Sequence, residues 1–493
     1  MKKYRNLLVF VIFIIFIYLR LSPIINKTVP YTYDQGRDFL KAEEIIRDKN
    51  ITFLGPTTGI AGVNHGAWWY YLLSVFYLIF SGWPIGFYLG LFFISTLSIV
   101  LFYFFIRKEF GWLSSLLFLL IITSSPYFVR LSFFASNNTV SPLFILLFIF
   151  SAYKYFKTES QRYLFFISFS LGFIFEFEVA FGLFIIVSFI VTSLFFKEFQ
   201  KAYFNIKKLP YLLGGFLIPM LPRILFEIKN NFIQSKAFIN YFLNPITTNK
   251  QTFLSAFFER YNLFIKYCQQ LFPIENKYMA FTFLFFIAVI FFSVRKQITK
   301  LNNNILLFLS SLIGFVFLLT LLNKNNFFWD YYLDGIQFML LFIIIIIFSF
   351  KTSNNLINHL KSVVMVIFMF LNIFVVYSEL SKRTIPQIGL RADDRIVNYF
   401  IENTGNKDFC LRIYTPPVIP YTYNYLFSYY SHKQKVKYPG IDYKNNKCFY
   451  LVDKDTYQFR VDKWEKENKP DSAKVTVIKQ FENGTVVKLV TLK

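Results

Sequence analysis

Charged side chains are scarce in this chain of 493 residues. They make up 16% of the sequence, well below the roughly 25% of a soluble domain, whereas 55% of the residues are hydrophobic. A soluble globular protein has too small a core for this much Phe, Ile and Leu, and the same composition excludes disordered and collagen-like chains. The sequence therefore predicts a polytopic membrane protein with a modest water-exposed part.

Cysteine and histidine are scarcer still, with three residues of each. The sequence has no CxxC pair and no His at metal-ligand spacing from a cysteine, which argues against a zinc site and against a disulfide scaffold. Cys410 and Cys448 both fall in the C-terminal part of the chain, where they either pair or remain free. We therefore assign no residue as a metal ligand.

Acidic residues are also few, because 28 Asp and Glu stand against 52 Lys and Arg, a formal net charge of +24. Such an excess is found in nucleic-acid-binding proteins, but in an apolar chain it is better explained by basic loops kept on the cytoplasmic side of a membrane. A site for an anionic lipid or a phosphate would use further cations. We therefore expect membrane lipids, and no nucleic acid, among the partners.

Long apolar runs fill most of the first 378 residues. The run 7–21 follows a short basic N-terminus and lacks a small-residue cleavage site, which predicts an uncleaved helix with its N-terminus inside. The other candidate spans are 67–82, 85–106, 113–128, 139–156, 163–176, 178–196, 209–226, 278–294, 304–322, 335–350 and 362–378. Arg107 and Lys108 should lie inside, which conflicts with two crossings within 67–106. We expect an odd total of 11 or 13 spans.

This orientation places the first loop, 24–66, and the tail outside. The tail 379–493 differs in composition from the transmembrane part, 1–378, and we expect it to form a small α+β domain of roughly 100 residues. Its expected helix begins at Ala392 and reaches Glu402. The expected strands are 410–414, 448–453, 474–479 and 485–491, the last two joined by a turn that ends at Gly484.

The first outside loop is the most informative segment for chemistry. Asp34, Arg37 and Asp38 lie within five residues, just after a span ends. Carboxylates close to a membrane are costly unless they are paired or used. If 37–47 is a helix, Asp34 sits at its N-cap. Two interpretations stay open: Asp34 caps a juxtamembrane helix, or the group carries chemistry.

The order of these features resembles the GT-C superfamily of membrane glycosyltransferases, and within it the bacterial relatives of protein O-mannosyltransferases and of the lipid A aminoarabinose transferase. The stretch 34–38, Asp-Gln-Gly-Arg-Asp, is similar to their Asp-Gln-Ala-Arg-Asp variant. The stretch 65–71, His-Gly-Ala-Trp-Trp-Tyr-Tyr, is similar to His-Gly-Pro-x-x-Tyr-Tyr. Weaker matches are 221–232, with its Phe-Glu-Ile-Lys run, and 414–417, Tyr-Thr-Pro-Pro.

The resemblance implies a sugar donor on a polyprenyl phosphate and an active site at the outer face of the cytoplasmic membrane. It implies that Asp34 is the general base, which takes a proton from a lipid, glycan or protein acceptor during an inverting displacement. An Asp partly withdrawn from water would suit this role, because its pKa is raised. Asp38 is the second catalytic candidate. Cations would hold the phosphate leaving group, and a divalent Mg or Mn ion remains an open option.

The sequence departs from the family pattern at two places. Relatives often carry a second carboxylate in the next outside loop, where this chain has Asn137 and Asn138. That change weakens a two-carboxylate or metal-bridged mechanism. Many relatives have a His-Tyr pair before a late span, and here Asp330 takes the place of the His.

Several polar residues near the outer ends of spans are candidates for binding substrate, although each also has a purely structural explanation. A helix cap, an interfacial charge or an internal ion pair would account for any of them equally well. The candidates are Arg37, His65, Arg130, Asn138, Glu176, Glu178, Arg223, Lys229 and Asp330.

A transporter or flippase for a lipid-linked or anionic substrate is the alternative from another class. Such a protein should show internal symmetry and broken helices at the midplane, and neither is visible in the sequence. The charges gather at one membrane face instead of the span centres, which favours interfacial chemistry over transport. An O-antigen ligase or polymerase would place Arg and His in a large late loop, but 227–277 offers only Arg260.

Overall fold

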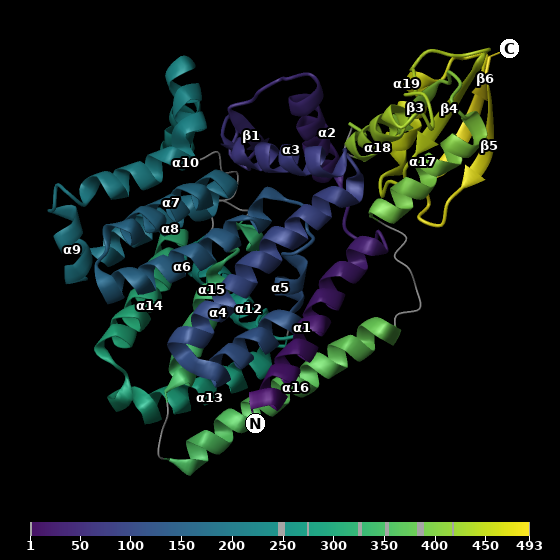
Figure 1. Ribbon diagram of the computed structural model, residues 1–493. Coiled ribbons are helices and arrows are strands. Elements are labelled where there is room, and N and C mark those ends of the chain that lie inside the picture. Colours follow the sequence, from purple (N-terminus) through teal and green to yellow (C-terminus); the bar gives the residue numbers. More distant parts are fainter. Residues whose placement is uncertain are drawn as a thin grey trace.

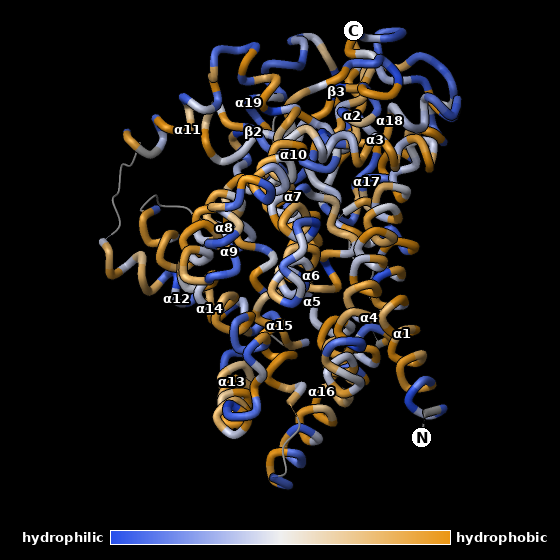
Figure 2. Tube along the Cα trace, turned by 60° about the vertical axis from the view of Figure 1, so that its left-hand side comes forward, coloured by the Kyte–Doolittle hydropathy of each residue, from blue (hydrophilic) through white to orange (hydrophobic). Residues whose placement is uncertain are grey.

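The computed structural model describes residues 2–244, 252–273, 276–323, 328–350, 354–381, 389–416 and 419–492. A bundle of helices carries a small sheet-containing region at one end (Figure 1). The N-terminus lies at the opposite end of the bundle in both views (Figures 1 and 2). Orange, hydrophobic residues run along the bundle helices, and blue, hydrophilic ones are frequent at the end that carries the C-terminal region (Figure 2).

The long helices of the bundle lie close to the predicted apolar runs, and shorter helices lie in the loops between them. The bounds are α1 Lys2–Ile25, α2 Tyr33–Arg47, α3 Trp68–Phe80, α4 Pro84–Ser124, α5 Pro126–Arg130, η1 Asn137–Thr139, α6 Ser141–Thr158, α7 Gln161–Phe177, α8 Val179–Ser193, α9 Lys197–Tyr203, α10 Leu209–Lys229, α11 Ile233–Leu243, α12 Phe253–Gln269, α13 Lys277–Val294, η2 Arg295–Gln297, α14 Lys300–Thr320, η3 Asp330–Leu333, α15 Ile336–Ser349 and α16 Asn355–Ser381. A short antiparallel pair, β1 Leu54–Thr57 and β2 Asn64–Gly66, lies between α2 and α3.

Among the described residues, seven helices are long and apolar enough to cross a membrane, or eight if the bent pair α8 and α9 counts as one span. This number is smaller than the 11 or 13 spans expected. The expected spans 85–106 and 113–128 are the two helical halves of α4, which are separated at Gly111, where the φ of 84° and ψ of −177° are not helical. The halves pack against each other, because the rings of Phe102 and Phe118 lie 5.6 Å apart. The expected span 67–82 forms α3, whose 13 residues rise about 20 Å, less than the hydrocarbon thickness of about 30 Å. One crossing, by the first half of α4, then suffices between the first loop and Arg107.

Arg20 of α1 holds the end of α4. Its side chain is fully buried and donates hydrogen bonds to the carbonyl of Ile122, at 2.6 Å, and to the hydroxyl of Ser132, at 3.1 Å. The last carbonyls of a helix lack intrahelical donors, and a cation beside them is favourable. Arg20 therefore stabilises the point where α4 ends before Pro126.

The C-terminal region is a four-stranded sheet with helices on both faces, which confirms the predicted α+β character. Its elements are α17 Leu390–Thr404, β3 Leu411–Tyr414, α18 Tyr421–His432, β4 Lys447–Val452, α19 Gln458–Asn468, β5 Lys474–Gln480 and β6 Val486–Thr491. The strand order is β3-β4-β6-β5, with β3 parallel to β4 and the other pairs antiparallel. Neighbouring residues of β4 face opposite helices, because Phe449 contacts α17 and Tyr450 contacts α19.

A disulfide joins Cys410 to Cys448, with their Cα atoms 4.6 Å apart, which settles the pairing that the sequence left open. The helix α16 extends to Ser381, three residues past the expected boundary at 378, and the segment 382–388 lies outside the described residues, as does Pro417. The exact start of the C-terminal domain therefore stays a prediction.

The C-terminal region rests directly on α2 (Figure 1). Lys27, before α2, pairs with Asp394 at 2.5 Å, and the Tyr31 hydroxyl donates to the carbonyl of Thr422 at 2.9 Å. A Cβ at Gly36 would lie 2.5 Å from the backbone nitrogen of Thr422. The helices α2 and α18 are therefore in backbone contact, which fixes the acidic segment 34–38 against the C-terminal region.

Candidate active site

The helix α2 begins four residues earlier than expected, at Tyr33, and its N-cap is Thr32. The backbone N–H of Thr32 donates to the side-chain oxygen of Gln35 at 2.8 Å, as in a capping box. The expectation that Asp34 is the N-cap is therefore wrong. Asp34 lies within the first turn, where a carboxylate is favoured by the helix dipole.

Arg37 joins the two carboxylates of this segment. One guanidinium nitrogen lies 3.0 Å from Asp34 Oδ1, and another lies 2.8 Å from Asp38 Oδ1. The indole N–H of Trp69 donates to Asp38 Oδ2 at 2.7 Å. The structure thus brings Asp34, Arg37 and Asp38 together and anchors the group to the start of α3.

The two carboxylates differ sharply in their environment. The side chain of Asp34 is 61% exposed, whereas that of Asp38 is 2% exposed. Burial raises the pKa of Asp38 to about 6, against the opposing effect of the Arg37 charge. The withdrawal from water expected for Asp34 therefore belongs to Asp38. Asp34 keeps an exposed carboxylate that is oriented by Arg37 and open to a substrate.

Arg223 is paired with Glu176. The Arg223 Nε donates to Glu176 Oε1 at 2.6 Å, and both side chains are buried. A Cβ at Gly66 would lie 1.8 Å from Glu176 Oε2, so this carboxylate lies against the backbone beside His65. The pair joins α7 and α10 beside β2 of the loop between α1 and α3. Arg223 is therefore committed to an internal carboxylate and is a poor candidate for holding a phosphate.

Gln234 completes this second group. Its side-chain oxygen accepts the backbone N–H of Asn64 at 2.7 Å and an Arg223 N–H at 3.4 Å. His65 is buried beside them, and burial together with the positive charges of Arg223 and Arg37 lowers its pKa to about 3. We call His65, Glu176, Arg223 and Gln234 the inner polar cluster.

The remaining candidates are spread around these two groups. Glu227 accepts the backbone N–H groups of Gln234 and Ser235 and so caps α11. Glu178 is the N-cap of α8, where it accepts the N–H of Ala180. Asp330 pairs with Lys266 at 2.5 Å. These contacts give Glu178 and Asp330 structural explanations.

Three polar candidates form no ion pair with a described residue. Asn138 is buried in η1, and Lys229 is exposed at the end of α10. Arg130 is exposed, and no described carboxylate lies within 4.0 Å of it. The amide of Gln35 donates to the carbonyl of Ala135 at 2.9 Å, which holds the loop after Arg130 against α2. Arg130 is thus the cation of this loop that remains available to an anion.

An apolar groove of about 790 Å³ runs between α3, α4, α6 and α7. It begins at Trp68 and Tyr71, next to the loop between α1 and α3, and reaches Phe102 and Phe105, just before Arg107. Val75 and Leu101 on its walls are at least half exposed, so the groove opens sideways. Trp68 lies in the groove wall, and the next residue, Trp69, holds Asp38.

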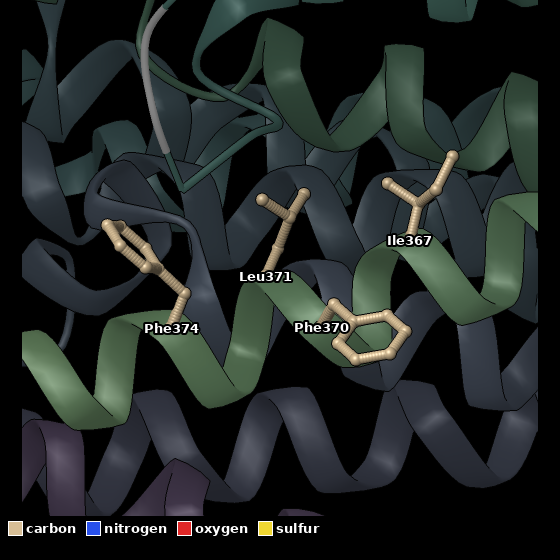
Figure 3. Close-up of a pocket in the computed structure, with 4 residues that line it drawn as sticks. All are labelled: Ile367, Phe370, Leu371 and Phe374. Atoms are coloured by element: carbon tan, nitrogen blue, oxygen red, sulfur yellow. The ribbon is translucent and has the colours of Figure 1, made fainter.

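A second hollow lies on α16 and is lined by Ile367, Phe370, Leu371 and Phe374 (Figure 3). All four side chains are apolar and come from one candidate span. A hollow of this kind provides no group for chemistry and suits contact with lipid chains. We therefore exclude it from the site.

In the part of the chain that the structure describes, no group of three or more His, Cys, Asp or Glu side chains could hold a metal ion. Asp34 and Asp38 each bond to Arg37 through Oδ1, and Trp69 holds the second oxygen of Asp38. The donor set therefore does not fit a divalent cation.

No protein-family model and no curated protein matches this sequence. Among solved structures, the chain is similar to ArnT from Cupriavidus metallidurans, both bound to undecaprenyl phosphate and in the apo state. Each match has a TM-score of 0.60 and 11% sequence identity, and covers 99% of this chain and 98% of ArnT. The chain has the GT-C fold. This finding confirms the fold expected from the resemblance, including the small C-terminal region.

The sequence alone missed three parts of the site. Gln234 has no motif around it and reaches the cluster only because α11 folds back after Glu227. Trp69 lies within the 65–71 motif, but nothing in the sequence indicates its indole hydrogen bond to Asp38. Tyr421, from the C-terminal region, packs edge-on against Tyr33 with ring centroids 4.8 Å apart. The only earlier signal for Tyr421 was the nearby 414–417 motif.

Proposed function

We propose that the chain is a membrane glycosyltransferase that moves a sugar from a polyprenyl phosphate to an acceptor at the outer face of the cytoplasmic membrane. One observation carries this proposal. The apolar groove opens sideways, and one of its walls is α3. The same helix, through Trp69, holds Asp38, the buried member of the Asp34–Arg37–Asp38 group. A donor with a long lipid chain and a polar reacting end requires these two environments side by side.

Asp34 is the proposed base. Its Oδ1 is oriented by Arg37, and its exposed carboxylate can accept the proton of an acceptor hydroxyl or amine. As that proton leaves, the acceptor atom bonds to the sugar C1, and the bond from C1 to the phosphate oxygen breaks with its electron pair. A single in-line displacement of this kind inverts the anomeric configuration.

Asp38 and Arg37 act as positioning residues. Asp38 is fixed by Trp69, and Arg37 is fixed by Asp38, so the guanidinium is held where it orients Asp34. Such a chain of charge-assisted hydrogen bonds limits the motion of the base. Asp38 itself lacks a free oxygen for a substrate proton, because Trp69 and Arg37 occupy both.

Arg130 is the proposed phosphate contact. It is exposed, lacks a carboxylate partner within 4.0 Å among the described residues, and belongs to the loop held against α2 by Gln35. An Arg guanidinium can bind two phosphate oxygens at once and balance the charge of the leaving group. Lys229 is a second, solvent-exposed cation at the same end of the bundle.

The test is turnover of labelled donors by the purified protein in lipid nanodiscs. A panel of radiolabelled polyprenyl-phosphate sugars, each with a full-length and a truncated prenyl chain, would be followed for release of the polyprenyl phosphate. We expect turnover of at least one sugar, and a lower KM for its full-length donor because that chain fills the groove. Absence of turnover across the panel would contradict the proposal.

A further inference from the structure

The inner polar cluster contains four buried polar atoms that have no hydrogen-bond partner among the described residues. They are His65 Nδ1, Glu176 Oε2, Arg223 Nη2 and Gln234 Nε2. All four side chains are more than nine-tenths buried. An unpaired buried polar atom costs about 1–3 kcal/mol, so four within one connected group indicate a ligand that satisfies them.

The contacts within the cluster keep these atoms close together. Glu176 and Gln234 both bond to the same Arg223 guanidinium, through Nε and Nη1. Gln234 also accepts the N–H of Asn64, the neighbour of His65. Elements far apart in the sequence, β2, α7, α10 and α11, thus contribute one side chain each to a single group.

The cluster is electrically balanced. The Glu176 charge is compensated by Arg223 at 2.6 Å, and Gln234 is neutral. Burial and the adjacent Arg223 and Arg37 lower the pKa of His65 to about 3, so its imidazole is neutral at physiological pH. The cluster therefore offers hydrogen-bonding atoms without a net charge to attract an ionic group.

The unpaired atoms include both donors and acceptors. Arg223 Nη2 and Gln234 Nε2 can only donate, and Glu176 Oε2 accepts, while neutral His65 Nδ1 does either according to its tautomer. A hydroxyl group donates and accepts at once, so adjacent hydroxyls match this set. A carboxylate would leave Glu176 facing a like charge, and an ammonium would leave both donors unpaired.

We propose that the inner polar cluster binds the hydroxyl groups of an uncharged sugar carried by the lipid donor. This inference rests on the proposed function and specifies the class of sugar. It excludes uronic acids and amino sugars as preferred donors. Arg223 then donates a hydrogen bond to the sugar through Nη2 and orients Glu176 beside it, whereas Arg130 binds the phosphate.

The experiment compares the Kd of bare polyprenyl phosphate with that of the same lipid carrying a neutral hexose, an aminopentose or a uronic acid, in nanodiscs. For the wild-type protein we expect the neutral sugar to tighten binding about tenfold over the bare lipid, and the charged sugars to add little. Equal Kd values for the bare and the neutral-sugar lipid, or tighter binding of a charged sugar, would overturn the inference.

Two variants assign the effect to the cluster. His65→Phe removes the ring nitrogen at similar size, and Gln234→Glu replaces the unpaired donor with an acceptor while keeping the oxygen that receives the Asn64 N–H. Both should lose most of the tenfold gain and keep the Kd of the bare lipid. Asn64→Ala is the matched control, because its side chain bonds to Gly55 outside the cluster.

Failure of this inference is distinguishable from failure of the proposed function. If neither the bare lipid nor any sugar-carrying lipid binds, the proposed function is wrong. If all bind alike and the neutral donor is still turned over, the function stands and the cluster has only a structural role. Unchanged selectivity in both His65→Phe and Gln234→Glu would lead to the same conclusion about the cluster.

Discussion

Arg37 lies between two carboxylates of unequal exposure, and this inequality gives each residue a different role. Asp34 is open to substrate, whereas Asp38 is enclosed by Trp69 and Arg37. The sequence predicted that all three residues form one group, but it also predicted that Asp34 is withdrawn from water, and in the structure Asp38 is the buried carboxylate. Exposure depends on how α2 is rotated against α3, which no local pattern of five residues determines.

The first prediction concerns pH. Asp38 faces Arg37, Asp34, Trp69 and Tyr70, and burial raises its pKa to about 6. Protonation removes the charge that holds Arg37, so turnover should fall as the pH drops through about 6. The raised pKa has the opposite effect on the stability of the fold, because the folded protein binds this proton more tightly than the unfolded protein does. The stability that Asp38 contributes is therefore greatest below about pH 3.8 and is lost as the pH rises through 6.

Asp38→Asn should therefore lower turnover at pH 7 about tenfold or more and remove the pH-dependent change near pH 6. The measurements are kcat and thermal unfolding between pH 4.5 and 8. A wild-type profile in which turnover and stability rise together near pH 6, or an unchanged profile in Asp38→Asn, would contradict the assigned role of Asp38.

Arg130 provides the second prediction at the residue scale. Arg130→Ala should weaken the binding of bare polyprenyl phosphate about tenfold, because a hydrogen bond to a charged group contributes about 1.5–3 kcal/mol. Arg162→Ala, an exposed Arg at the start of α7, is the control and should leave the Kd unchanged. If Arg130→Ala binds like wild type, the phosphate is held elsewhere.

At the scale of elements, the contact between α2 and α18 connects the C-terminal region to the site. Gly36 allows this contact, since a Cβ there would meet the backbone of Tyr421 and Thr422 at 2.5 Å. The helix α2 was expected from the sequence, beginning at residue 37, whereas no helix was expected at α18. The docking of α2 against α18 was not predictable. The sequence shows Gly36 only as a member of the 34–38 motif, and nothing in it indicates that another helix packs against this glycine.

Gly36→Ala is the prediction for this contact. Alanine is about 1 kcal/mol better than glycine inside a helix, so a gain in stability is the local expectation. The clash with two backbone segments should reverse the sign and destabilise the fold by about 1–3 kcal/mol. Gly214→Ala, inside α10 with no atom within 4 Å of its added Cβ, is the matched control.

The melting temperature in detergent distinguishes the two variants. Gly36→Ala should lower it and reduce turnover, while Gly214→Ala should leave it unchanged or raise it slightly. A stabilised Gly36→Ala protein would show that α2 and α18 are not in close contact.

At the scale of the whole molecule, composition and hydropathy predicted a helical membrane protein with a C-terminal α+β region, and the observed fold agrees. The location of that region outside the membrane stays a prediction. The 11 or 13 spans expected from hydropathy exceed the seven or eight helices that are long and apolar enough to cross a membrane among the described residues, because hydropathy measures apolar length and not crossing. The helix α3 is apolar yet shorter than the hydrocarbon thickness, whereas the two apolar runs within α4 are separate helices that meet at Gly111, as the sequence predicts. The residues that build the inner polar cluster come from four separate elements, so their meeting followed only from the tertiary structure.

The orientation of the molecule gives the next prediction. Positively charged connections, such as that around Lys296, should lie inside, and the first loop with Asp48 should lie outside. The disulfide between Cys410 and Cys448 agrees with an oxidising compartment for the C-terminal region. A membrane-impermeant thiol reagent should label Asp48→Cys in intact cells and Lys296→Cys only after permeabilisation, with the unmodified protein as background. The reverse pattern would place the proposed site on the wrong face.

The most direct test of Asp34 as the general base is to measure donor binding and sugar transfer separately in Asp34→Asn. The measurement is the Kd of the labelled donor and its single-turnover rate in the same nanodisc preparation, with Glu44→Gln on α2 as the control. We predict that Asp34→Asn binds the donor within about threefold of wild type and loses transfer by at least a hundredfold, while Glu44→Gln retains both. Transfer at the wild-type rate by Asp34→Asn would contradict Asp34 as the base and the mechanism built on it.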